Sequence, residues 1–308
     1  MKSKMYNISK KMVIALLIAC LAVGTVNFAI NSFFYNPADN FNNASSVFAI
    51  LNQLLSPTVT ESYLEQEVQI GFPRFSHHSQ DFRLLKFSYS RSPYEPQNTG
   101  NINYSFGKAT LKEYIDRLSL NDLTCRQSLF LSSDKTQTDW KLIFDNKSYE
   151  AWLKFEEPID KEVFSEKYGW LLDNDISRSK QCGISWISIK TSGKVEDICL
   201  GLAGNLSFHY MNPYNAFAGQ NFYNMDLLDR EFAFNEALKF LINHPKDTNI
   251  FINTGLWTGA EKMEFKNRYD YVQENGIQYL GFVTYIKGSD LRTLESDSVS
   301  IIRLNEDK

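Results

Sequence analysis

The amino-acid sequence predicts an α+β protein, in which a single N-terminal transmembrane helix precedes an extracytoplasmic region with β-α-β units. Three observations lead to this prediction. A long apolar run near the N-terminus carries no charge, stretches of alternating apolar residues indicate strands, and a strand–turn–helix plan occurs twice in the second half. With 308 residues, 43% of them hydrophobic, the chain can form a core of one or two domains.

The apolar run predicts the transmembrane helix. Residues 12–34 contain no Lys, Arg, Asp or Glu, and about 20 mostly apolar residues cross a hydrocarbon core about 30 Å thick. The run is preceded by four lysines and no acidic residue: Lys2, Lys4, Lys10 and Lys11. The positive-inside rule therefore predicts a single-pass protein of the cell membrane. Residues 1–11 form a short cytoplasmic tail, residues 12–35 the span, and the C-terminal region is extracytoplasmic.

Two alternatives to an uncleaved span remain open. The residues from Leu17 to Cys20 resemble a lipobox, in which Cys20 would be lipidated after cleavage. A cleavage site near Gly24 would instead give a secreted form. The apolar run continues past both positions, which favours the span. The main alternative is an extracytoplasmic ligand-binding lipoprotein anchored at Cys20.

Residues 36–135 are predicted to form a juxtamembrane helix and a β-rich segment. Apolar residues at helical spacing predict a helix over 38–56, which Pro57 ends. Alternating apolar residues predict strands within 58–75 and 81–91. The Pro- and Asn-rich residues 92–101 indicate a loop, and the spacing over 108–120 indicates a helix.

Residues 136–308 contain the repeated plan. Segments 149–168 and 278–297 each consist of a strand, a turn and a short helix, and a further strand follows each, at 184–189 and 298–304. Two such β-α-β units can share one sheet, as in ferredoxin-like folds, with both helices on one face. Two longer helices are predicted between the units, over 229–244 and 259–276.

The sequence argues against several classes of function. The net charge of −4 and the absence of a basic stripe argue against a nucleic-acid partner. The motifs of metalloproteases, serine hydrolases and P-loop proteins are absent. His77, His78 and Asp81 can be drawn as metal ligands, but their segment is more typical of a polar loop. We therefore predict no enzyme activity, no cofactor and no metal site.

Three cysteines follow the predicted span, so at most one disulfide can form among them. Cys182 and Cys199 flank a strand-and-turn segment and are the preferred pair. The alternative, that all three are reduced, remains open.

An aromatic, Asn-rich segment is the candidate binding loop. Residues 209–224 read HYMNPYNAFAGQNFYN. Aromatic side chains give a large contact area at low entropic cost, so we predict ligand or partner contacts from Tyr210, Tyr214, Phe217, Phe222 and Tyr223. The alternative is a long connection that packs its aromatic side chains onto the sheet.

The run GLWTGAEKMEFKNRYDYVQENGIQYLGFVTYIKGSDLRTLESDSVSIIRL, residues 255–304, resembles the C-terminal domain of the sigma factor regulator family. These are membrane-bound, anti-sigma-factor-like proteins, largely of Gram-positive bacteria. The segment YEAWLKFEEPID (149–160) resembles the start of that domain, and residues 10–37 resemble the family's N-terminal region. The resemblance implies a membrane protein of signal transduction and transcription regulation, with residues 136–308 as its sigma factor regulator C-terminal-like domain.

The expected partners follow from this topology. Residues 1–11 are too few to fold alone, since a small domain needs roughly 40 residues, and they hold no Cys or His for a zinc-type domain. Direct binding of an extracytoplasmic-function sigma factor is therefore the less favoured expectation. Besides the membrane itself, the favoured partner is a second membrane protein.

Overall fold

The computed structural model describes residues 2–33, 41–56, 59–63, 69–70, 78–87, 94–105, 108–115, 130, 139–172, 183–193, 198–204, 227–253, 257, 260–296 and 298–306. The fold is α+β, as predicted, and the described strands form two five-stranded antiparallel sheets. We call them sheet A (β1–β5) and sheet B (β6–β10). Sheet A falls within the predicted region 36–135 and sheet B within the predicted region 136–308.

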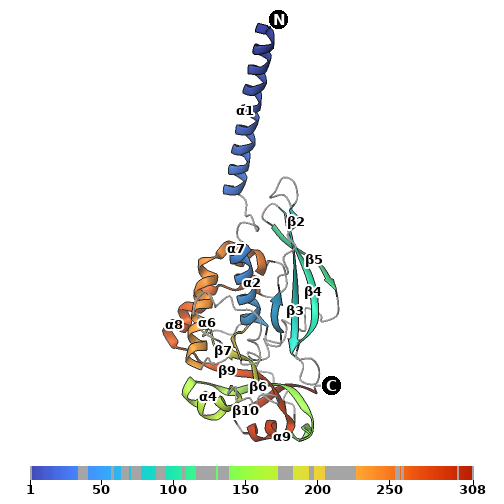
Figure 1. Cartoon of the computed structure of the whole chain (residues 1–308). Coiled ribbons are helices and arrows are strands. Elements are labelled where there is room, and N and C mark those ends of the chain that lie inside the picture. Colours follow the sequence, from blue (N-terminus) through green and yellow to red (C-terminus); the bar gives the residue numbers. More distant parts are fainter. Residues whose placement is uncertain are drawn as a thin grey trace.

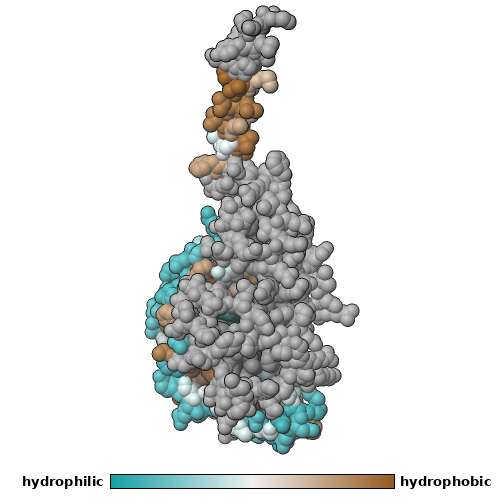
Figure 2. Space-filling model, viewed as in Figure 1, coloured by the Kyte–Doolittle hydropathy of each residue, from teal (hydrophilic) through white to brown (hydrophobic). Residues whose placement is uncertain are grey.

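The N-terminal helix α1 (Lys2–Phe33) is continuous over 32 residues and extends away from the rest of the molecule (Figure 1). Its described side chains, those of residues 11–26 and Phe28, are all exposed. Figure 2 shows them as a largely hydrophobic column, whereas the coloured surface of the body is mainly hydrophilic. Among the residues that the structure describes, no helix combines the length and the apolar character needed to cross a membrane.

The second helix, α2 (Phe41–Leu55), corresponds to the helix predicted over 38–56. Unlike those of α1, its apolar side chains are buried, among them Phe48, Leu51 and Leu54. It contacts β1 of sheet A, β8 of sheet B, and two helices of the body, α6 and α7. In Figure 1 it lies below α1, between these helices and sheet A.

Sheet A has the strand order β1-β3-β4-β5, with β2 beside β3. Its strands are β1 (Val59–Tyr63), β2 (Gln69–Ile70), β3 (His78–Phe87), β4 (Tyr94–Ser105) and β5 (Lys108–Ile115).

Two local predictions in this region are wrong. Most of the predicted loop 92–101 lies in β4, and the predicted helix 108–120 begins with β5. The register shows why: β4 pairs with β3 from Tyr94 to Tyr104 and with β5 from Thr99 to Ser105. These pairs with the strands next to β4 in the chain supply the backbone hydrogen bonds of residues whose local propensity favours turns or helix.

Sheet B has the strand order β10-β6-β9-β7-β8. Its strands are β6 (Ser148–Ile159), β7 (Gly183–Ile189), β8 (Leu200–Ala203), β9 (Tyr279–Lys287) and β10 (Val299–Glu306). One unit runs β6-α4-β7 and the other β9-α9-β10, where α4 is Lys161–Tyr168 and α9 is Gly288–Leu291. Because β9 lies between β6 and β7, and β6 between β10 and β9, each unit encloses a strand of the other. The repeated plan predicted from the sequence thus forms one sheet.

Three further helices complete the body: α6 (Leu227–Asn243), α7 (Pro245–Ile252) and α8 (Phe265–Asn275). The helix predicted over 229–244 is α6, and the one predicted over 259–276 divides into a short 3-10 helix, η5 (Ala260–Lys262), and α8. The helix α7 was not predicted, because a proline after a helical pattern ordinarily indicates a helix stop, whereas Pro245 occupies the first turn of a new helix. Shorter 3-10 helices are η2 (Trp140–Leu142), η3 (Gly169–Leu171) and η6 (Arg292–Leu294).

The two faces of sheet B differ. On the face that we call the helix-covered face, Ala151, Leu153, Phe155 and Phe282 join the main core, to which α4 and α9 contribute Phe164 and Leu291. Both short helices therefore pack on the same side, as predicted. The opposite face, which we call the cluster face, carries a smaller core of Phe130, Trp152, Trp186, Cys199 and Val283.

Candidate functional site

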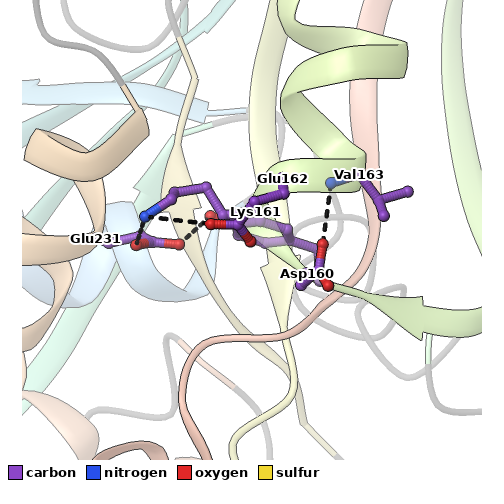
Figure 3. Close-up of polar contacts among 6 residues, drawn as sticks. Asp160, Lys161, Glu162, Val163 and Glu231 are labelled. Atoms are coloured by element: carbon purple, nitrogen blue, oxygen red, sulfur yellow. Dashed lines mark hydrogen bonds and ion pairs between the residues drawn. The ribbon is translucent and has the colours of Figure 1, made fainter.

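A polar cluster at the start of α4 connects three elements (Figure 3). Asp160 ends the turn after β6, and its side chain accepts a hydrogen bond from the Val163 backbone N–H at 2.9 Å, which caps the helix. The next residue, Lys161, places its Nζ 3.9 Å from Glu231 Oε2 on α6 and 4.0 Å from Glu162. The side chains thus tie α6 to the first turn of α4.

Tyr279, at the start of β9, holds the other oxygen of Glu231. Its hydroxyl donates to Glu231 Oε1 at 2.5 Å. Burial of Tyr279, then the hydrogen bond to Glu231 and the negative charge of that residue, raise the pKa of the phenol above its ordinary value. The tyrosine is therefore held in its protonated, donating form. The cluster stabilises a carboxylate at the edge of the core.

A buried carboxylate lies on the cluster face of sheet B. Glu150 is 3% exposed. Its Oε1 accepts from Trp152 Nε1 at 3.0 Å and from Asn305 Nδ2 at 3.1 Å, and its Oε2 accepts from the Tyr285 hydroxyl at 3.0 Å. Three donors from β6, β9 and β10 thus converge on one carboxylate, as the burial of a charge requires.

Beside this network lies the aromatic cluster of Phe130, Trp152 and Trp186. The Phe130 ring stacks on Trp152 at a centroid distance of 5.6 Å and lies 5.9 Å from Trp186. It covers Gly281 of β9, where a Cβ would lie 2.7 Å from the Phe130 ring and 2.1 Å from the Leu153 carbonyl oxygen. The close approach of the ring leaves no room for a side chain at residue 281, and its φ of +158° is also one that glycine adopts most readily.

Two further polar groups border this cluster. Burial lowers the pKa of Lys154 below its ordinary value, and attraction to Cys199 opposes the shift. Ser188 is fully buried, and its hydroxyl has no hydrogen-bond partner in the part of the chain that the structure describes.

The predicted disulfide stays a prediction, because Cys182 lies outside the described residues. Its expected partner, Cys199, is buried on the cluster face. The spacing of the cysteines did not reveal that Cys199 would pack against tryptophan rings, where a small apolar side chain fits.

The other predicted site residues are placed as follows. Cys20 is an exposed residue in the middle of α1, and the helix continues past it to Phe33. The candidate binding loop lies outside the described residues, together with Tyr210, Tyr214, Phe217, Phe222 and Tyr223.

The residues weighed as metal ligands do not form a visible site. Of these residues, His78 and Asp81 belong to β3, while His77 is outside the described residues. Within the described part of the chain, no group of three His, Cys, Asp or Glu side chains is arranged to hold a metal ion.

The Glu150 network was not predicted from the sequence, although a signal for it exists. In the strand YEAWLKF, alternation places Glu150, Trp152 and Lys154 on the face opposite to Ala151 and Leu153. Charged residues alternating with strongly apolar ones would ordinarily mark a solvent-exposed face. The large Trp152 between them is the sign that this face is covered.

Comparisons with family models, with curated proteins and with solved structures find no match to this chain.

Proposed function

We propose that this chain is a single-pass membrane protein with a regulatory or sensory role, and that its extracytoplasmic α+β body acts through α1. The observation that carries the proposal is the surface of α1. Exposed apolar residues lie all round it: Met12, Val13, Ile14, Leu16, Leu17, Ile18, Leu21, Val23, Val26 and Phe28. A helix that is hydrophobic on every side is typical of a membrane span or of a core, and nothing described in the chain covers this one.

The length of the uncharged run supports the same proposal. The side chains described without interruption in α1 are those of residues 11–26, which is shorter than the about 20 residues that a span requires. In the sequence the uncharged run continues to residue 34, and the helical backbone continues to Phe33. The helix also passes through Cys20 without a break, which favours a span over a lipid-anchored N-terminus.

The finer part of the proposal is that the body is ferredoxin-like and that the chain is a sigma factor regulator. Two observations support it. The order β10-β6-β9-β7 is that of two interlocked β-α-β units. The segments that resemble the family, 149–160 and 255–304, include most of β6 and the chain from α8 to most of β10. The proposed mode of action is contact with a second membrane protein through the span or the body.

The first experiment tests the anchor. An extracellularly active reporter is attached after Lys308, and the mass of the purified chain is compared with and without an inhibitor of lipoprotein signal peptidase. We expect residue 1 to be retained, the reporter to be active outside, and the inhibitor to change nothing. A mature chain that begins at lipidated Cys20 would overturn the span and leave the lipoprotein alternative.

A second measurement tests the membrane contact directly. The double variant Leu17→Lys, Leu21→Lys should move the protein out of the membrane fraction, since each lysine at the centre of a span costs about 2.5–3.5 kcal/mol. The matched control is the double variant Leu228→Lys, Phe232→Lys, which places the same two charges, at the same spacing, on apolar residues of α6 that are 58% and 60% exposed. Equal fractionation of the two variants would contradict the membrane proposal.

A third measurement tests the regulatory role. The protein is photo-crosslinked in cells and purified in mild detergent, and the products are identified by mass spectrometry. We expect a second membrane protein among them. Recovery of neither a membrane protein nor a sigma factor would contradict this part of the proposal while leaving the anchor intact.

A further inference from the structure

The helix α2 follows α1 closely in the chain and contacts both sheets. Residues 34–40 connect the two helices, and at about 3.3–3.6 Å per residue this segment can extend to at most about 25 Å. At its other end, α2 stops at Leu55 and β1 of sheet A starts at Val59. The helix α2 also contacts β8 of sheet B. A movement of either sheet would therefore displace α2, which is the helix nearest to α1 in the chain.

Two tryptophans hold the C-terminal turn of α2. Trp186 of β7 donates its Nε1–H to the Gln53 carbonyl oxygen at 3.0 Å, and Trp257 donates to the Ser56 hydroxyl at 3.1 Å. The last carbonyls of a helix have no partner within the helix, so a side-chain donor there fixes the turn. Within the turn, the Ser56 backbone N–H bonds to the Asn52 carbonyl at 2.9 Å. We call the two indole bonds the α2 clamp.

Trp186 belongs to two structures at once. Its ring is part of the aromatic cluster on the cluster face, 5.9 Å from Phe130, and its N–H belongs to the α2 clamp. A displacement of this ring therefore disturbs the cluster and withdraws the donor from Gln53 together.

The clamped turn also contains an unsatisfied group. The side-chain oxygen of Asn52 is buried, with the residue 2% exposed, and among the described residues it has no hydrogen-bond partner. A buried acceptor without a partner costs free energy. The free energy of the clamped arrangement is therefore higher than it would be with an apolar residue at this position. The free-energy gap between the clamped arrangement and one in which the last turn of α2 is loosened is correspondingly smaller.

We propose that α2 is the element that couples the aromatic cluster of sheet B to α1, with Trp186 as the positioning residue. This inference rests on the proposed membrane anchoring. When Trp186 holds Gln53, α2 is fixed, and the outer end of α1 is restricted to the reach of residues 34–40 from it. When Trp186 moves, the last turn of α2 loosens and the outer end of α1 gains freedom.

The test uses the full chain in liposomes of phosphatidylethanolamine and phosphatidylglycerol. Hydrogen exchange reports on the Ser56 amide, and labelling with a membrane-impermeant maleimide reports on a Ser32→Cys substitution near the outer end of α1. Each cysteine is read separately by peptide mass spectrometry. Protection of the native Cys20 in the same sample shows that α1 is inserted, so a failure of the anchor is distinguished from a failure of the coupling.

The decisive variant is Trp186→Phe, which keeps an aromatic ring and removes the donor. We expect exchange at Ser56 to rise about tenfold, because the Gln53 carbonyl loses its partner. We expect labelling at residue 32 to rise about fivefold, the lower end of ordinary coupling between sites. The matched control is Trp152→Phe, which removes an indole donor from the same cluster but one that bonds Glu150 and not α2, so it should raise both rates less than Trp186→Phe does.

A second variant acts in the opposite direction. Asn52→Leu replaces the unsatisfied amide with an apolar side chain of similar size, so exchange at Ser56 and labelling at residue 32 should both fall. The coupling is wrong if Trp186→Phe speeds exchange at Ser56 without any change at residue 32 while Cys20 stays protected. It is equally wrong if Asn52→Leu leaves both rates unchanged, and this variant decides the matter if Trp186→Phe does not fold.

Discussion

The two faces of sheet B are built from alternate residues of the same strands, yet their buried side chains are stabilised in different ways. On the helix-covered face, Leu153, Phe155 and Phe282 pack against helices and need no polar partner. On the cluster face, the side chains of Glu150 and Lys154 lie beside aromatic rings. The Glu150 carboxylate accepts hydrogen bonds from donors on three strands. The difference teaches that one strand sequence can serve an apolar core and a buried polar network, provided that the buried carboxylate receives hydrogen bonds from several strands.

The largest expected effect comes from the helix-covered face. Phe282 is fully buried, and its ring centroid lies 5.3 Å from Tyr168, 5.8 Å from Phe164 and 5.9 Å from Phe155. Phe282→Ala should lower the free energy of unfolding by about 3–5 kcal/mol, measured by denaturant titration in detergent. Phe144→Ala, at a site 57% exposed, should change it by less than about 0.5 kcal/mol. Similar losses in both would mean that the face is not tightly packed.

A smaller effect is expected from the buried carboxylate. Glu150→Gln keeps the shape of the side chain but replaces a charged acceptor with an amide that also carries donors. We expect a loss of about 1.5–3 kcal/mol in the free energy of unfolding, the ordinary size for hydrogen bonds to a charged group. Glu156→Gln, on the exposed part of the same strand, is the control. If the two variants are equally stable, the three donors do not need a charged partner.

The smallest effect, of opposite sign, is expected at Lys154. Because burial lowers the pKa of its ammonium, the unfolded state binds more protons than the folded state between the lowered pKa and the ordinary value of 10.5. Stability should therefore rise with pH in that window. Lys154→Met removes the buried charge and should stabilise the protein at neutral pH, by less than about 1 kcal/mol because the group is partly exposed.

The variant Lys154→Met also separates the pH dependence of stability that is due to Lys154 from the dependence that is due to Tyr279. Tyr279 has a raised pKa, so its contribution to stability is lost as pH rises above about 10, which is the opposite slope. The difference between the stability curves of wild type and Lys154→Met cancels the tyrosine contribution. A difference that does not shrink as pH rises toward 10.5 would contradict the assigned cause.

The sequence predicted those elements whose signal is local. The repeat at 149–168 and 278–297 has strict alternation followed by a short amphipathic turn of helix, and it became β6-α4 and β9-α9. The stop at Asn275-Gly276 marked the end of α8, where Gly276 adopts φ +74°. By contrast, β4 and β5 were misread, because their pairing with neighbouring strands outweighs a composition that by itself favours a loop or a helix.

The candidate sites divide in the same way. Cys20 in an apolar helix and the uncharged run around it are visible in the sequence. The α2 clamp is not, because Gln53 and Trp186 are distant in sequence and only the packing of α2 against the edge of sheet B joins them.

By itself the sequence determined the α+β class, the long apolar N-terminal helix and the β-α-β plan, because periodicity and composition within a short window decide how a segment hides its apolar side chains. The tertiary structure alone decided which face of sheet B received helices, which buried charges found donors, and that Cys199 lies among aromatic rings. These outcomes depend on strand order and register, since hydrogen bonds and ring contacts form between residues that the folded chain brings together.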